Sequence, residues 1–248
     1  FNTACVLDFS GSIDNTELNT MLSAVREAGL ALFGSSSGNV SIRLIGFSST
    51  AESISFGGVD VFADAVSFVQ AIDSLNPATG GSRPFNGGTD FTAGIEELMD
   101  VYVPNPNASN QVFFLSDGNP NEQTGSGGNS LANATRADWI NFVNNGDINV
   151  TTIGVGNGII TERLQDVDVD GQGAPVLVDN FDDLVQALLD IVVALPVSGD
   201  LDANDNFGAD GGRIQSITVS GTTYTWDGNN TITRTGANPG TQSGNNIS

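Results

Sequence analysis

The segment Ala4-Cys5-Val6-Leu7-Asp8-Phe9-Ser10-Gly11-Ser12 joins an apolar run to a carboxylate and two hydroxyl groups. The apolar run predicts a buried strand over residues 4–8, because a short apolar stretch that stops at polar residues is typical of a sheet interior. The Asp-x-Ser-x-Ser sequence at its end supplies oxygen ligands, which hard divalent cations such as Mg²⁺ prefer. Gly11 permits the tight bend that would bring these oxygens together. The segment therefore predicts a metal-binding turn at the end of a buried strand.

Two later segments have a similar character. Gly87-Gly88-Thr89-Asp90 precedes a helical pattern, and Phe113-Phe114-Leu115-Ser116-Asp117-Gly118 is a second apolar run that ends in an acidic residue. Each segment also has an ordinary structural interpretation. Thr89 and Asp90 could serve only as a helix N-cap, and Asp117-Gly118 could be a simple turn. The three segments together, in this order, favour one shared site over three unrelated turns.

Predicted strands alternate with predicted helices along residues 1–196. We expect strands at residues 4–8, 40–47, 51–56, 111–116, 149–155 and 175–178. We expect helices at residues 15–33, 62–72, 91–98, 131–143, 160–164 and 181–195, and a loop at residues 77–88. This alternation predicts an α/β fold, with a doubly wound, mostly parallel six-stranded sheet and helices on both faces. The short hairpin after residue 47 supplies one antiparallel strand.

The five candidate ligands are Asp8, Ser10, Ser12, Thr89 and Asp117. In type and order they resemble the metal-ion-dependent adhesion site of von Willebrand factor A (VWA) domains, and the resemblance covers residues 2–195. It implies the strand order 3-2-1-4-5-6, which brings the strands before Asp8 and Asp117 together at the point where open α/β sheets bind ligands.

The resemblance also implies a role for each ligand. Ser10 and Ser12 bind the ion directly. Thr89 and Asp117 exchange direct and water-mediated contact, and Asp8 acts mainly through water. The expected ion is Mg²⁺, with Mn²⁺ and Ca²⁺ as alternatives, and one coordination position is left for an acidic group of the partner.

Loops around the site are expected to select the partner. The expected rim residues are Phe9, Gly11, Phe85, Asn86 and Asn119, together with the Gly-rich segment 121–129. Phe9 has an alternative position in the core.

The composition is strongly acidic: 29 Asp and Glu residues against seven Arg and no Lys give a net charge of −22. Phosphate contacts need a basic patch, so nucleic acid is not expected as a partner. The charge favours a solvated acidic surface in a salty medium or a surface that carries Ca²⁺ ions. The single Cys5 allows no intrachain disulfide. The lack of His excludes imidazole metal ligands and His-based catalytic triads.

Residues 197–248 contain few apolar side chains, arranged in short β-like runs. They predict a small β-rich extension, or part of a domain, that begins with an acidic junction. The candidate Ca²⁺ ligands in this junction are Asp200, Asp202, Asn204, Asp205 and Asp210. The junction resembles those between the extender domains of repeats-in-toxin (RTX) adhesins, which are long secreted bacterial proteins stiffened by Ca²⁺. A weaker calcium pattern, or else an exposed turn, is Asp166-x-Asp168-x-Asp170-Gly171.

These features predict a binding module and not an enzyme. The resemblance implies a metal-dependent adhesion domain of a large secreted or cell-surface bacterial adhesin, which binds a protein or peptide carboxylate on a host cell or in a biofilm. A calcium-stiffened spacer of a surface fibre is the alternative. A metal-dependent hydrolase is disfavoured because no general base is evident. No apolar run is long enough to insert into a membrane, and the chain is expected to be a monomeric module of a longer protein.

Overall fold

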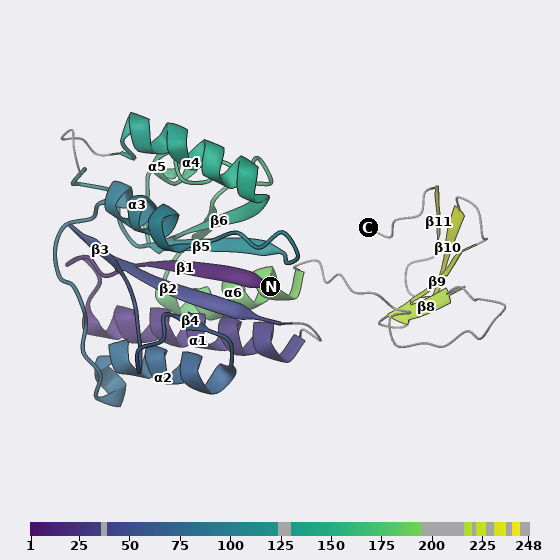
Figure 1. Cartoon of the computed structure of the whole chain (residues 1–248), viewed down its shortest axis with the longest axis horizontal. Coiled ribbons are helices and arrows are strands. Elements are labelled where there is room, and N and C mark those ends of the chain that lie inside the picture. Colours follow the sequence, from purple (N-terminus) through teal and green to yellow (C-terminus); the bar gives the residue numbers. More distant parts are fainter. Residues whose placement is uncertain are drawn as a thin grey trace. The chain divides into compact units, whose positions relative to one another are not determined.

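The computed structural model describes residues 1–35, 39–123, 130–194, 216–219, 222–226, 231–236 and 240–243. The chain consists of two compact units, Phe1–Pro196 and Val197–Ser248, and each is described by itself (Figure 1). In the described part of the chain, no helix has the length and apolar character needed to cross a membrane.

A seven-stranded sheet forms the centre of the first unit. Its strands are β1 (Asn2–Asp8), β2 (Ser41–Phe47), β3 (Ala51–Ser53), β4 (Val61–Phe62), β5 (Asn110–Ser116), β6 (Ile148–Val155) and β7 (Val176–Val178). The order along the sheet is β3-β2-β1-β5-β6-β7, with β4 paired to β2 outside this path. Strands β2, β1, β5, β6 and β7 pair in parallel, whereas β3 and β4 run antiparallel to β2. The expected doubly wound, mostly parallel sheet is confirmed, but it has seven strands where six were expected, because β4 adds a short antiparallel strand beside β2.

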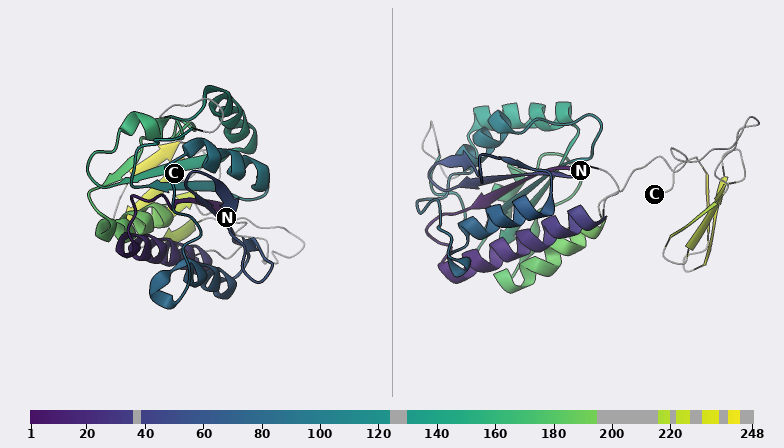
Figure 2. Two further views of the ribbon diagram at one scale, coloured as in Figure 1. Left: turned by 90° about the vertical axis from the view of Figure 1, so that its left-hand side faces the viewer. Right: turned by 60° about the horizontal axis from the view of Figure 1, so that its bottom comes forward.

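Helices cover both faces of this sheet (Figures 1 and 2). They are α1 (Asn15–Ser35), α2 (Ala65–Leu75), α3 (Phe91–Val101), α4 (Asn133–Gly146), α5 (Thr161–Gln165) and α6 (Phe181–Ala194). Side chains of α1, α2 and α6 form one core cluster with Cys5 and Leu7 of β1. Side chains of α3, α4 and α5 form the other cluster with Ala4 and Val6. Alternate residues of the central strand therefore point into two separate cores, which explains why the segment is apolar throughout.

The structure corrects three expected boundaries between residues 51 and 88. Phe62, expected to begin a helix, lies in β4, and α2 begins only at Ala65 because Asp64 caps it by accepting hydrogen bonds from the Val66 and Ser67 amides. The hairpin strand expected at residues 51–56 ends at Ser53. The loop expected at residues 77–88 contains a short 3₁₀ helix, η1 (Pro77–Thr79).

The packing of α1 on α2 gives a testable prediction about Gly29. A Cβ atom at this position would lie 2.5 Å from Cζ of the fully buried Phe68. Gly29→Ala is therefore expected to lower the free energy of unfolding by about 1–3 kcal/mol, because the ring must move within a packed core. Gly34→Ala is the matched control in the same helix, since nothing lies within 4 Å of its added Cβ. Urea denaturation measures both variants, and equal stability of the two would contradict the prediction.

The second unit contains a four-stranded antiparallel sheet of order β11-β10-β9-β8. Its strands are β8 (Ser216–Val219), β9 (Thr222–Trp226), β10 (Thr231–Gly236) and β11 (Gly240–Ser243). The β-rich character expected for the extension is present, and two of the strands, β10 and β11, lie beyond the segments that the sequence pattern singled out.

Candidate metal site

The candidate ligands converge where two neighbouring strands end. Asp8 is the last residue of β1, Asp117 directly follows β5, and these strands pair in parallel with Leu7 opposite Leu115. The two carboxylates therefore emerge at the same edge of the sheet. On one side β1 continues to β2 and on the other to β5, so this edge is the point where strand order reverses and where open α/β sheets bind ligands.

Asp8 organises the turn from within the protein. Its side chain is fully buried, Oδ1 accepts a hydrogen bond from the Ser10 amide at 2.7 Å, and Oδ2 accepts one from the Ser116 hydroxyl at 2.6 Å. Burial raises the pKa of Asp8 to about 6, although the hydrogen bonds from Ser116 and Ser10 oppose this shift. A buried carboxylate with these bonds fixes the backbone of the turn, and a nearby cation would offset its desolvation.

Three oxygen donors follow one another around the site. The Ser10 and Ser12 hydroxyl oxygens lie 3.0 Å apart, and the Ser12 hydroxyl donates to Asp117 Oδ1 at 2.9 Å. Thr89 Oγ1 lies near the same turn: a Cβ built on Gly118 would lie 3.6 Å from Thr89 Oγ1 and 3.7 Å from Ser12 Oγ, so both hydroxyls flank Gly118. The structure thus brings together oxygen atoms from three segments that are far apart in the sequence.

Thr89 is held at this edge by its own backbone. Its amide donates to Asn121 Oδ1 at 2.9 Å, and its carbonyl accepts hydrogen bonds from the Asn121 and Glu122 amides. The N-cap of α3 is Asp90, whose carboxylate accepts from the Thr92 and Ala93 amides. The capping role considered for this pair therefore belongs to Asp90, and the Thr89 hydroxyl lies beside Gly118, next to Asp117.

The donor set fits a small, hard cation. Adjacent ligands of an octahedral Mg²⁺ ion, bound at about 2.0–2.1 Å, lie about 2.9–3.0 Å apart. The Ser10–Ser12 and Ser12–Asp117 oxygen separations, 3.0 and 2.9 Å, match this value. The described residues contain no group of three or more Asp, Glu or Cys side chains that could hold a metal ion. This site differs from such a group because only Asp8 and Asp117 are acids, and its other candidate ligands are the hydroxyls of Ser10, Ser12 and Thr89.

Arg83 is a site residue that the sequence patterns did not reveal. Its guanidinium donates to the carbonyls of Phe9, Ser10, Ile13 and Phe85, with N–O distances of 2.6–2.7 Å to Phe9, Ile13 and Phe85. Burial lowers the pKa of Arg83, whereas the carboxylates of Asp8 and Asp117 raise it. Arg83 therefore clamps the Asp-x-Ser-x-Ser turn through its backbone and places a positive charge near its acids.

The expected rim residues separate into two groups. Phe9 is fully buried and packs edge-on against half-buried Phe85, with ring centroids 6.3 Å apart, so the expectation that Phe9 lies on the rim is wrong. Gly11 and Asn86 are exposed beside each other, where a Cβ on Gly11 would lie 3.0 Å from Asn86 Oδ1. Asn119 ties two loops together, donating to the Gly158 carbonyl and accepting from the Ile160 amide.

The two calcium patterns have different outcomes. Asp168 accepts a hydrogen bond from the Thr152 hydroxyl, Asp170 accepts from the Val150 amide, and Asp166 pairs with Arg136. These aspartates fasten their segment to β6 and α4. Among the described residues, they do not form a group of three acidic side chains that could hold a metal ion. The junction residues Asp200, Asp202, Asn204, Asp205 and Asp210 lie outside the described residues, as do residues 124–129 of the Gly-rich loop.

Comparison with known proteins agrees with this architecture. Residues 3–119, which include all five candidate ligands, match the model of the von Willebrand factor type A domain family. No curated protein matches the chain. The solved structures that it resembles include the vWF domain of the type V pili tip protein Mfa5 from Porphyromonas gingivalis, with 13% identity over 81% of this chain and 97% of that chain and a TM-score of 0.62.

Two further structures share the fold. One is proximal thread matrix protein 1 from the mussel byssus with a zinc-occupied MIDAS motif, with 18% identity over 77% of this chain and 46% of that chain and a TM-score of 0.58. The other is a von Willebrand factor type A protein from Catenulispora acidiphila, with 18% identity over 77% of this chain and 41% of that chain and a TM-score of 0.56. The chain thus spans less than half the length of these two proteins. At such identities the likeness shows a common mixed α/β fold.

Proposed function

We propose that residues 1–196 are a von Willebrand factor A domain that binds a protein or peptide partner through a metal-coordinated carboxylate. The observation that carries the proposal is that the five oxygen-bearing side chains lie where the strand order of the sheet reverses. Two of their oxygen separations, Ser10–Ser12 at 3.0 Å and Ser12–Asp117 at 2.9 Å, suit Mg²⁺. The zinc-occupied MIDAS motif of the mussel protein supports a divalent ion in this fold. The pilus-tip origin of Mfa5 supports a role in adhesion.

The five residues have two different roles in the proposed site. Ser10, Ser12, Thr89 and Asp117 would hold the ion, which would supply a positively charged position for an acidic group of the partner. Asp8 holds the turn from below through the Ser10 amide and the Ser116 hydroxyl. The ion remains Mg²⁺ by preference, with Mn²⁺ and Ca²⁺ as alternatives. Nothing in this arrangement requires a catalytic base, and we assign the domain to binding and not to catalysis.

The setting of the domain is also part of the proposal. We place it in a large secreted or cell-surface bacterial adhesin of the RTX kind, as a monomeric module outside the cell, with residues 197–248 as a β-rich extension. The acidic composition, with 29 acidic residues against seven Arg, suits a salty or Ca²⁺-rich medium. Calcium at the junction that begins near Asp200 would stiffen the chain between the two units.

The function is tested with pairs of peptides that differ only in charge. A library of hexapeptides, each containing one Asp or Glu, is compared with the matching Asn or Gln peptides on the immobilised full chain, in Mg²⁺ and in EDTA. We expect retention of acidic peptides in Mg²⁺ alone. The net charge of −22 repels acidic peptides, so nonspecific attraction cannot produce this preference. Equal binding of acid and amide peptides, or binding unchanged by EDTA, would refute the proposed function.

A further inference from the structure

The segment that carries the candidate ligand Thr89 is held by side chains of two other loops. The Gly88 amide donates to Ser49 Oγ at 2.7 Å, and the Thr89 amide donates to Asn121 Oδ1 at 2.9 Å. Ser49 lies between β2 and β3, and Asn121 lies in the segment after β5. Two consecutive backbone amides are therefore bound by side-chain oxygens that come from different parts of the sequence.

Backbone hydrogen bonds reinforce both contacts. The Ser48 carbonyl accepts from the Asp90 amide at 3.0 Å. The Thr89 carbonyl accepts from the Asn121 amide at 3.0 Å and from the Glu122 amide at 3.1 Å. Asn121 thus binds Thr89 in both directions, since it accepts from the Thr89 amide and donates to the Thr89 carbonyl. The backbone of Thr89 is fixed on both sides by residues outside the five-residue motif.

The two glycines before Thr89 permit this close approach. A Cβ built on Gly87 would collide with Ser49 Oγ, and a Cβ built on Gly88 would lie 2.8 Å from Asn121 Oδ1. Each glycine therefore faces one of the two side-chain acceptors, at a distance that leaves no room for a side chain. The Gly-Gly sequence is what the contacts with Ser49 and Asn121 require.

The position of the Thr89 hydroxyl matters because Mg²⁺ demands near-ideal octahedral geometry. Thr89 is only 3% exposed, so its side chain moves little unless its backbone moves. Groups that orient metal ligands by hydrogen bonds typically contribute a factor of about 10–100 to metal affinity. Loss of either side-chain acceptor would free the backbone amide next to, or belonging to, the ligand itself.

We propose that Ser49 and Asn121 are positioning residues, which hold Thr89 in place for the ion without touching the ion themselves. The inference rests on the metal site of the proposed function and adds two residues that the Asp-x-Ser-x-Ser, Thr and Asp pattern does not contain. Both act through Thr89, so their contribution to metal affinity exists only while the Thr89 hydroxyl is present.

Isothermal titration of Mg²⁺ into the metal-free full chain tests this dependence. We expect Asn121→Ala and Ser49→Ala each to weaken Mg²⁺ binding about tenfold. Each substitution is then repeated in a Thr89→Val background, which removes the hydroxyl and keeps the shape of the side chain. In that background we expect each to change the Mg²⁺ affinity by less than about twofold, because residues that act through one ligand are not additive with it.

The matched control is Asn105→Ala. Asn105 is also an exposed asparagine whose Oδ1 accepts from a backbone amide at 2.9 Å, in this instance that of Asn107. It precedes β5, whereas the candidate metal site lies beyond the other end of that strand. We expect Asn105→Ala to leave the Mg²⁺ affinity as it is in the unaltered chain.

Hydrogen exchange of the backbone amides gives a second measurement, made in EDTA and independent of the metal. We expect faster exchange of the Thr89 amide in Asn121→Ala and of the Gly88 amide in Ser49→Ala, because each loses its acceptor. Asn105→Ala should change neither rate. Unchanged exchange at both amides in their respective variants would overturn the inference, since the two side chains would then not hold the segment.

Two outcomes of the titration would also overturn it. One is a Mg²⁺ affinity of Asn121→Ala and Ser49→Ala equal to that of the Asn105→Ala control. The other is an equal loss with and without the Thr89 hydroxyl, which would show that the two residues do not act through this ligand.

The peptide comparison separates this inference from the proposed function. If the variants lose Mg²⁺ affinity as expected but acidic and amide peptides bind the unaltered chain equally, the proposed function fails and the positioning role stands. If acidic peptides bind only in Mg²⁺ but the variants keep full Mg²⁺ affinity, the function stands and the positioning role is refuted. Absence of Mg²⁺ binding by the unaltered chain would refute both.

Discussion

Asp117→Asn is expected to weaken Mg²⁺ binding by at least about 100-fold, the largest effect on metal affinity that we predict for a single substitution. Mg²⁺ sites in proteins depend on one or two carboxylates. Of the two carboxylates at this site, Asp8 has each oxygen engaged by a hydrogen bond within the protein. Asp117 is therefore the carboxylate available to the ion. A factor of about 100 corresponds to about 2.7 kcal/mol of binding free energy, which is reasonable for the loss of one charged ligand.

Isothermal titration of Mg²⁺ into metal-free protein measures this effect. Ser12→Ala should also reduce affinity, since Ser12 joins the oxygens of Ser10 and Asp117. Asp138→Asn in α4 is the control, because this exposed residue makes the same change in charge away from the site. Unchanged Mg²⁺ affinity in the Asp117 and Ser12 variants would show that the five residues are not the metal site. Residual Ca²⁺ uptake in these variants would be consistent with separate ions at the acidic junction.

The parts of this site that the sequence predicted share a simple cause. Asp8 and Asp117 stand where apolar runs end, and parallel strands of one sheet end at one edge, so the runs themselves predict that the two acids meet. Thr89 was predictable because it precedes a clear helical pattern. In each instance a local pattern marks the residue, and the regular geometry of the sheet supplies the rest.

The burial of Phe9 follows from the alternation of side chains along strand β1, although its place in the Asp-x-Ser-x-Ser motif suggested that it lies on the rim. Its amide donates to the Phe47 carbonyl at 2.7 Å, so the backbone of β1 continues its extended course one residue beyond Asp8. Alternation then places Phe9 on the face of Cys5 and Leu7, in the core that α1, α2 and α6 cover. The strand period favoured a buried Phe9, and membership of the Asp-x-Ser-x-Ser motif was a weaker guide to exposure.

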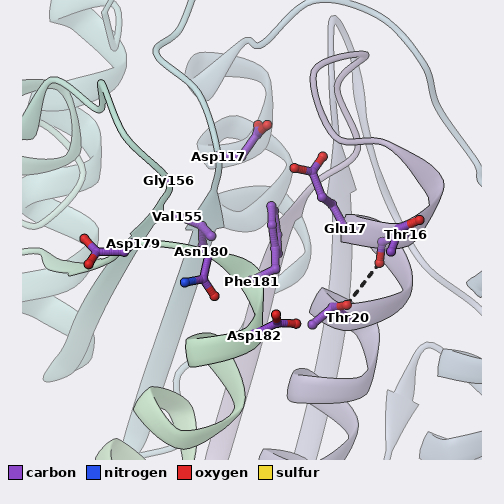
Figure 3. A pocket seen from close by; sticks show the side chains of 10 residues that line it. All are labelled: Thr16, Glu17, Thr20, Asp117, Val155, Gly156, Asp179, Asn180, Phe181 and Asp182. Carbon is purple, nitrogen blue, oxygen red and sulfur yellow. Dashed lines mark hydrogen bonds between the residues drawn. The ribbon is translucent and has the colours of Figure 1, made fainter.

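Other features could not be predicted from local patterns. Phe62 reads as the start of the amphipathic run of α2, and only the Asp64 cap separates the two. The pocket beside Asp117 draws its residues from α1, the end of β5, β6 and α6, which meet only in the folded sheet (Figure 3). Such sites depend on tertiary packing. Their acidic residues cannot be recognised in the sequence, because acidic residues occur over the whole surface of this protein.

Arg83 belongs to this second group, and its replacement gives the second large effect. It lies in a loop without periodicity, yet it donates hydrogen bonds to four backbone carbonyls, three of them in the turn that carries Ser10 and Ser12. Arg83→Met removes these bonds and leaves the carbonyls unsatisfied. We expect the free energy of unfolding to fall by about 3 kcal/mol, since bonds to charged groups contribute more than neutral ones. Urea denaturation measures the loss.

The effect of Arg83 on the metal separates a positioning role from a purely structural one. At a temperature where all variants are folded, Arg83→Met should weaken Mg²⁺ binding roughly 10- to 100-fold, the range for groups that orient metal ligands. Arg83→Lys keeps the charge near Asp8 and Asp117 but cannot reproduce the planar fork, so a geometric role predicts little recovery. Arg26→Met, which removes a partly exposed arginine paired with Glu27, should change neither quantity appreciably. If Arg83→Met lowers stability while Mg²⁺ affinity stays at its original value, the turn keeps its ligand geometry without the clamp, and Asp8 alone suffices to hold Ser10 in place.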